Sequence, residues 1–178
     1  MPFCPQSELS GIHSVNQGDV VWYRRRFDAP KAERLLLHFG AVDYRATVWV
    51  NGEEVARHEG GHTPFSANIT RVVHDGDNVV VVRAEDPLAD KTIPRGKQYW
   101  KQPTESIFYT PTTGIWQTVW LEPLPERAIE YLRITPDFDA REVELEIGGE
   151  GPKRATVAFD SRQIGEWNGD GSKARIAL

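Results

Sequence analysis

The chain has 178 residues and a formal net charge of −5, with 26% charged and 39% hydrophobic residues, as in a globular chain of one domain and part of a second. The negative charge argues against nucleic acid as a partner, because nucleic acid is bound by basic surfaces. No apolar run approaches the ~18 residues of a membrane-spanning helix, and Cys4 is the only cysteine, so no intrachain disulfide can form.

Residues 1–19 are rich in proline and glycine and are predicted to be irregular. They lack the charged and apolar regions of a signal peptide, so we expect a cytoplasmic protein. Strands are predicted from Val20 to Phe27 and from Tyr44 to Val50, where the residues alternate between two faces, and from Arg34 to Phe39, where the apolar run is nearly continuous. Asn51-Gly52 accepts positive φ at both positions, which predicts a hairpin to a partner strand from Glu53 to His58.

The middle of the chain continues the pattern of short strands and turns. A strand is expected from Thr63 to Ala67, and Thr70 can cap one helical turn that ends at His74. Val79 to Val82 is wholly apolar, as in a strand buried on both faces, and Ile115 to Leu121 alternates as one continuous strand.

A long segment from Pro87 to Thr113 shows no sustained period and reads as a loop. It exceeds the ~12–15 residues beyond which unstructured loops are uncommon and usually functional. Aromatic faces suit the C–H faces of sugars, and basic or amide groups donate to hydroxyls. The predicted binding residues are therefore Arg95, Lys97, Gln98, Tyr99 and Trp100. The alternative is that Tyr99 and Trp100 pack against a partner domain.

Other site chemistry is weakly supported. Glu105 and Asp86 are the carboxylates nearest the aromatic loop, but acidic loop residues are usually just solvated, so no catalytic residue is assigned. The five histidines lack the paired spacing of a zinc site. The turn from Asp75 to Asn78 lacks the glutamate that a calcium loop needs. No metal and no cofactor are expected.

The composition shifts at Pro123-Leu124-Pro125, a stiff linker. Beyond it, strands are predicted over 131–135, 143–147, 155–159 and 174–178. Many short strands with frequent turns predict an all-β fold: a jelly-roll sandwich over residues 1–124, followed over 125–178 by a partial immunoglobulin-like sandwich.

Four segments resemble the amino-terminal, galactose-binding-like sugar-binding domain of glycoside hydrolase family 2, the group of β-galactosidases, β-glucuronidases and β-mannosidases. Val21 to Phe27 is similar to its first jelly-roll strand, and Phe39 to Gly52 to its central hairpin. Gly60 to Phe65 with Ile69-Thr70 is similar to the next element, and Thr113 to Leu121 to the signature that closes the domain. In order and spacing they cover residues 20–123.

The resemblance implies a module on the substrate side of a β-glycosidase. In this family, both catalytic glutamates belong to a (β/α)₈ barrel that follows the second sandwich, so this chain alone is expected to be inactive. The loop before the Gly-Ile-Trp strand and the loop matched by Gln6 to Asp19 lie near the mouth of that barrel. The implied partner is therefore a carbohydrate, a β-glycoside, bound together with the barrel, and homo-oligomerisation stays open. The alternatives are a free-standing lectin-like module and a purely structural interdomain module.

Overall fold

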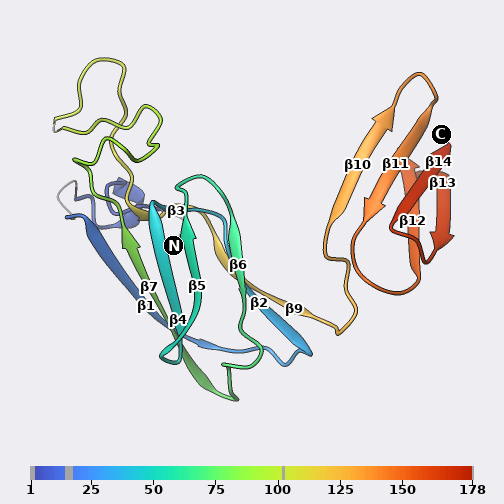
Figure 1. Cartoon of the computed structure of the whole chain (residues 1–178), viewed down its shortest axis with the longest axis horizontal. Helices are drawn as coiled ribbons and strands as arrows, with labels where there is room; N and C mark the ends of the chain where they lie inside the picture. Colours follow the sequence, from blue (N-terminus) through green and yellow to red (C-terminus); the bar gives the residue numbers. More distant parts are fainter. Residues whose placement is uncertain (1–2, 15–17, 102, 178) are drawn as a thin grey trace. The chain divides into compact units, whose positions relative to one another are not determined.

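The computed structural model describes residues 3–14, 18–101 and 103–177, and the chain divides into two compact units, Met1–Pro123 and Leu124–Leu178 (Figure 1). Regular structure in the described part is β-strand apart from one 3₁₀ turn, η1 (Glu8–Ser10). The all-β expectation is therefore confirmed.

The first unit is a sandwich of two antiparallel sheets. The larger sheet has the strand order β1-β7-β4-β5, the smaller has the order β6-β2-β9, and β3 pairs separately with β8. The strands are β1 (Val20–Asp28), β2 (Arg34–Phe39), β3 (Val42–Asp43), β4 (Arg45–Val50), β5 (Glu53–Glu59), β6 (Phe65–Asn68), β7 (Asp77–Glu85), β8 (Gly114–Ile115) and β9 (Val119–Leu124).

Alternation along the strands builds the core of this unit. On β2, Leu35, Leu37 and Phe39 are buried while the residues between them are half-buried, and β4 shows the same pattern. Because successive side chains of a strand point to opposite faces, these residues all enter the space between the sheets. The Phe39 ring is fully buried and stacks on Phe65 with 4.7 Å between ring centroids. Burying a side chain of this size contributes about 1.5–3 kcal/mol to stability.

The Asn51-Gly52 turn forms as the sequence predicts. The φ angles are 52° at Asn51 and 87° at Gly52, and Val50 pairs with Glu53 across the turn. The Asn51 amide donates to Asn78 Oδ1 over 2.8 Å and accepts from the Val79 backbone N–H over 2.9 Å. The turn therefore also ties the β4–β5 hairpin to the start of β7.

The second unit contains a three-stranded sheet and a hairpin (Figure 1). The sheet has the order β10-β11-β14, and the hairpin pairs β12 with β13. Its strands are β10 (Leu132–Asp137), β11 (Glu142–Ile147), β12 (Lys153–Phe159), β13 (Arg162–Gly169) and β14 (Lys173–Ala177). Alternate residues of β11 and β14 form its small core, while β13 was not expected from the sequence.

Two expectations for strands in the first unit are wrong. Val79, Val80 and Val81 are all half-buried and not buried on both faces, and burial alternates only in the second half of β7, where Val82 and Ala84 are buried. The strand expected from Ile115 to Leu121 is interrupted and becomes β8 and β9, in different sheets.

The cap expected at Thr70 is also wrong, although the chain makes one tight turn here. The backbone N–H groups of Val72 and Val73 both bond to the carbonyl of Ile69, three and four residues back. The Thr70 hydroxyl does not cap a helix; it accepts a hydrogen bond of 2.8 Å from the Leu35 backbone N–H. The Thr70 side chain is therefore used in a hydrogen bond to a residue 35 positions away, and it is not available as a local helix cap.

Gly52→Val should lower the free energy of unfolding by about 1 kcal/mol or more, because a β-branched side chain is strained at positive φ. A Cβ at Gly52 would meet no atom within 4 Å, so a loss of stability in this variant would come from backbone strain and not from a steric clash. Urea denaturation measures the effect. Gly52→Asn is the matched control and should cost much less, since Asn tolerates positive φ; equal midpoints for the Val variant and the parent chain would contradict the expectation.

Candidate functional site

The long loop between β7 and β8 begins and ends on buried polar side chains. Thr113 Oγ1 donates to the carboxylate of Asp86 over 3.1 Å and accepts from the Gln6 side-chain amide over 3.1 Å. The Asp86 backbone N–H donates to the carbonyl of Asp19 over 2.8 Å. Both ends of the loop are thus held beside the amino-terminal segment, as Figure 1 shows.

Asp43 on β3 holds the middle of the loop. Its Oδ2 accepts a hydrogen bond of 2.8 Å from the Gln98 amide and one of 3.3 Å from the Thr112 hydroxyl. The Gln98 carbonyl in turn accepts from the Thr112 backbone N–H over 2.5 Å. Gly61 packs directly against the Asp43 carboxylate, and a Cβ at this glycine would lie 2.2 Å from Asp43 Oδ1. A side chain at position 61 would therefore displace the group on which the loop rests.

Burial changes the ionisation of both aspartates. Desolvation raises the pKa of Asp43, although its hydrogen bonds from Gln98 and Thr112 lower it in part. Desolvation, followed by repulsion from Asp43, raises the pKa of Asp86 to about 6. Near neutral pH this end of the sandwich therefore holds two carboxylates that resist being charged together.

Arg95 closes a smaller turn within the loop. Its guanidinium donates to the backbone carbonyls of Leu88, over 2.5 Å, and of Pro87 and Asp90. The Arg95 guanidinium, which was expected to bind a ligand, therefore holds the shape of the loop. Only its buried Nε–H is left without a hydrogen-bond partner among the described residues.

A pocket of about 300 Å³ opens beside this turn, lined by Lys91, Ile93, Arg95, Gly96, Gln98 and Trp100. Lys91 Nζ lies 5.2 Å from the centre of the Trp100 ring, a cation–π distance. The volume is at the lower end of the ~300–1,000 Å³ of small-molecule sites. The pocket offers an aromatic wall and an ammonium group, which suit a small ligand that carries hydroxyl or carboxylate groups.

The five residues expected to bind a ligand separate into two groups. Arg95, Gln98 and Trp100 line the pocket, whereas Lys97 and Tyr99 are not part of its lining. Tyr99 is buried and stacks on Phe108 with 4.9 Å between ring centroids. Tyr99, Trp100 and Phe108 therefore form a small aromatic cluster, and Trp100 is the member that borders the pocket.

Lys91, Ile93 and Gly96 are pocket residues that sequence reasoning did not select, and Asp43 is a supporting residue that it did not select. An aspartate within the apolar run of residues 41–44 is a signal that could have found Asp43, because a buried carboxylate needs hydrogen-bond partners.

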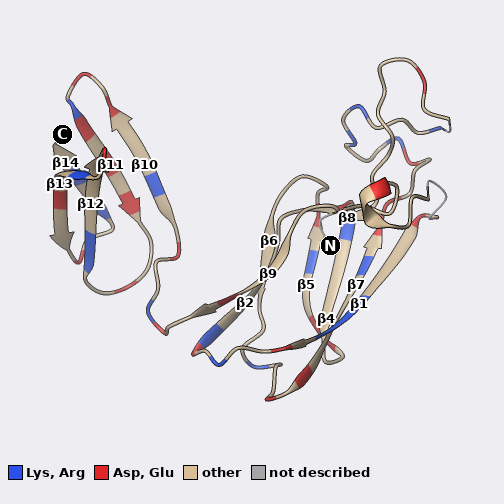
Figure 2. Cartoon of the chain, turned by 180° about the vertical axis from the view of Figure 1, so that it is seen from behind, with Lys and Arg blue, Asp and Glu red and all other residues tan. Residues whose placement is uncertain are grey.

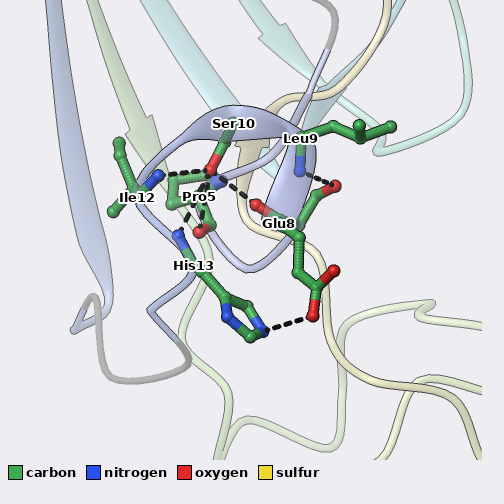
Figure 3. Close-up of polar contacts among 7 residues, drawn as sticks. Pro5, Glu8, Leu9, Ser10, Ile12 and His13 are labelled. Carbon is green, nitrogen blue, oxygen red and sulfur yellow. Dashed lines mark hydrogen bonds and ion pairs between the residues drawn. The ribbon is translucent and has the colours of Figure 1, made fainter.

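The amino-terminal turn packs its polar groups inward (Figure 3). The Ser10 hydroxyl donates to the Ser7 carbonyl over 2.7 Å and accepts from the backbone N–H of Ile12 over 3.0 Å. His13 Nε2 lies 3.9 Å from a carboxylate oxygen of Glu8, in an exposed contact. Ser10 is therefore the centre of a local turn, and its hydroxyl bonds to backbone groups of this turn.

The two carboxylates nearest the loop each have a hydrogen-bond partner within the unit. Asp86 is hydrogen-bonded to Thr113, and the Glu105 carboxylate is 3.4 Å from the hydroxyl of Tyr99. The described part of the chain holds no group of three or more His, Cys, Asp or Glu side chains that could bind a metal ion. Over the same residues, no helix has the length and apolar character required to cross a bilayer.

Comparison with known proteins adds one family and several relatives. Residues 2–116 match the family described as glycosyl hydrolase 2 galactose-binding domain-like. A β-glucuronidase from Paenibacillus borealis is 43% identical over 84 residues, 45% of this chain and 14% of that protein. The β-glucuronidase of Rattus norvegicus is 32% identical over 146 residues, 70% of this chain and 22% of that protein.

A solved structure shows the same fold. The β-glucuronidase of an uncultured Clostridium species aligns with a TM-score of 0.70 at 25% identity, over 91% of this chain and 30% of that one. This chain thus spans between about a seventh and a third of the length of these relatives.

The raised pKa of Asp86 predicts a stability that depends on pH. The folded state holds this proton more tightly than the ordinary value of 3.8 allows, so stability should fall as pH rises from about 4 to about 6. At pH 8 the ionised carboxylate should cost roughly 2–3 kcal/mol, at 1.36 kcal/mol per pKa unit.

Asp86→Asn should therefore raise the denaturation midpoint at pH 8 and flatten the profile between pH 4 and pH 6. Urea titrations at several pH values measure both effects. Asp75→Asn, at an exposed carboxyl in the turn before β7, is the matched control and should leave the profile unchanged. A profile that keeps its full slope in Asp86→Asn would contradict the expectation.

Proposed function

The chain belongs to glycoside hydrolase family 2, whose galactose-binding-like domain it matches over residues 2–116, and we propose that it is the non-catalytic, substrate-side module of a glycosidase that hydrolyses β-glycosides. The pocket at Lys91, Arg95 and Trp100 is the observation that carries this proposal. The names of the relatives favour β-glucuronides among such substrates.

The groups that line the pocket suit the C–H face and the oxygen atoms of a sugar. The half-exposed indole of Trp100 offers a face for C–H groups, and the ammonium group of Lys91 offers donors to hydroxyl or carboxylate oxygens. Gln98 has its amide committed to Asp43 and Thr112, so it positions the loop and does not contact the sugar.

The chemical step requires a part of the enzyme outside this chain. Retaining glycosidases use two carboxylates about 5–5.5 Å apart, and Asp86 and Glu105 each have an internal partner instead. The proposed source of the two carboxylates is a (β/α)₈ barrel, with the second unit of this chain as the start of an intervening immunoglobulin-like sandwich. In this arrangement the long loop borders the entrance to the barrel's active site.

The chain by itself should not hydrolyse aryl β-glucuronides, β-galactosides or β-mannosides. A chromogenic assay at millimolar substrate measures this, with a β-glucuronidase as the positive control. Turnover above background that disappears in Glu105→Gln or Asp86→Asn would overturn the non-catalytic role.

In a full-length family 2 glycosidase that carries this chain as its module, Trp100→Ala should lower kcat/KM by about tenfold to a hundredfold, or ~1.4–2.8 kcal/mol of transition-state binding. Lys97→Ala, at an exposed residue of the same loop outside the pocket, is the control and should change kcat/KM less than twofold. Strong sugar affinity of the isolated chain would favour a lectin instead. No effect of Trp100→Ala in either setting would favour a purely structural module.

A further inference from the structure

The sequence contains two Asn-Gly pairs, and the fold holds them differently. Asn51-Gly52 forms the turn between β4 and β5, and Asn168-Gly169 ends β13. An asparagine followed by glycine is especially prone to lose its side-chain amide spontaneously, because glycine has no side chain that hinders attack by its backbone nitrogen. Each pair is therefore a candidate site of covalent modification, and the structure around the pair decides its rate.

Three hydrogen bonds hold the side-chain amide of Asn51. Its Nδ2 donates to the carbonyl of Val72 and to Asn78 Oδ1, each over 2.8 Å, and its Oδ1 accepts from the Val79 backbone N–H over 2.9 Å. The Asn51 backbone N–H also donates to the Val79 carbonyl over 2.9 Å. The amide is therefore fixed to the start of β7 and to the segment before it, between 21 and 28 positions away in the sequence.

Asn78, one of these partners, is itself firmly held. Its side chain is fully buried, its amide donates to the carbonyls of His74 and Gly76 over 2.9 Å, and its Oδ1 accepts from the His74 backbone N–H over 3.0 Å. Rotation of Asn78 away from Asn51 would leave buried polar groups without partners, which is unfavourable. The closed turn is therefore a rigid environment for the Asn51 amide.

Asn168 is held by fewer contacts. Its Nδ2 donates to Glu166 Oε1 over 2.8 Å, and this is its one side-chain hydrogen bond with the described residues. Both side chains are exposed, so water competes for this bond. Asn168 is thus an internal reference, because it has the same reactive dipeptide in the same chain without the contacts of the turn.

We propose that Asn51 is a latent deamidation site, which reacts when the β4–β5 turn opens and whose product prevents the turn from closing again. In this reaction the Gly52 backbone nitrogen attacks Asn51 Cγ, and a new C–N bond closes a five-membered succinimide. The bond from Cγ to Nδ2 breaks, the Gly52 nitrogen gives up its proton, and Nδ2 leaves as ammonia. Water then opens the succinimide at either carbonyl, which leaves aspartate or isoaspartate at position 51. No oxidant or reductant is consumed.

The closed turn suppresses the first step. Cγ must change from planar to tetrahedral as the ring closes, and Nδ2 must take up a proton before it leaves as ammonia. Both changes break the hydrogen bonds that Nδ2 donates to Val72 and Asn78. The reaction is therefore expected from states in which local unfolding has separated the turn from β7.

The product cannot restore the turn. A carboxylate has no N–H group, so the Val72 carbonyl and Asn78 Oδ1 would each face a negative oxygen in place of a donor. Acidic residues already flank the turn, with Asp77 at the start of β7 and Glu53 and Glu54 at the start of β5 (Figure 2). A further negative charge is repelled by them, and isoaspartate also lengthens the backbone within the hairpin.

The test follows both sites in the same chain. The protein is incubated at mildly alkaline pH, either folded in buffer or unfolded in concentrated guanidinium chloride. Trypsin then separates the two sites into the peptides 46–57 and 163–173, and mass spectrometry measures the fraction of each in which the amide has become an acid. The two sites should react at similar rates when unfolded. Folding should slow the reaction of Asn51 at least tenfold and slow that of Asn168 less.

One variant tests the contacts that hold the amide. Asn78→Ala removes an acceptor of Nδ2 and should speed the reaction of Asn51 in the folded chain at least tenfold, with the reaction of Asn168 unchanged. Asn68→Ala, at an exposed asparagine of β6, is the matched control and should change neither rate. If Asn78→Ala fails to fold, the unaltered chain in low denaturant replaces it. The rate at Asn51 should then rise in parallel with hydrogen exchange of the Val79 amide, which bonds to Asn51 only in the closed turn.

A second variant tests the product. Asn51→Asp has the side chain of the aspartate product and should lower the urea midpoint of the first unit, whereas Asn168→Asp should leave that midpoint unchanged.

Three results would overturn the proposal: equal rates at Asn51 in the folded and the unfolded chain, a greater slowing at Asn168 than at Asn51, or a midpoint for Asn51→Asp equal to that of the parent chain. The lack of any reaction at Asn51 in the unfolded chain would also overturn it. The turn has no residue in common with the lining of the sugar pocket, so this proposal and the proposed function fail independently.

Discussion

The hydrogen bond of 2.8 Å between the Gln98 amide and the Asp43 carboxylate holds the functional end of the first unit together. The long loop pairs little of its backbone, apart from the bridge between Gln98 and Tyr109 and a few turns. Its position therefore depends on side chains, and Asp43 provides the fixed point because it is almost wholly buried on β3. A buried carboxylate is costly unless it is hydrogen-bonded, so the loop and Asp43 stabilise each other.

The two ends of the sandwich use buried polar groups for different purposes. At the end that holds the β4–β5 turn, Asn78 is fully buried and its amide donates to the carbonyls of His74 and Gly76, while its oxygen accepts from Asn51. These hydrogen bonds join neutral groups, so they bury no charged group at this end. At the other end, Asp43 and Asp86 bring two carboxylates into one buried region, at a cost in stability near neutral pH. Buried carboxylates that lower stability in this way are common at functional sites, where residues are placed for function as well as for stability.

Some aromatic and basic residues of the loop hold its shape, and others line the pocket. The Arg95 guanidinium binds loop carbonyls and Tyr99 packs against Phe108, so both act first on the shape of the loop. Lys91 and Trp100 are left at the surface of the pocket.

Local pattern by itself determined most strands of the first unit, the hairpin turn and the family resemblance. The apolar run of Leu35, Leu36 and Leu37 predicts the same bounds for β2 as the structure shows, Arg34–Phe39, and Asn51-Gly52 predicts a turn with positive φ at both positions. These features depend on near neighbours, which a sequence displays directly. Only the tertiary structure decided that Gln98 meets Asp43, 55 positions away, that Tyr99 is buried, and that Asn51 bonds to Asn78. Such contacts depend on which strands pair and on how the two sheets pack. The periodicity of the sequence predicts neither the pairing nor the packing.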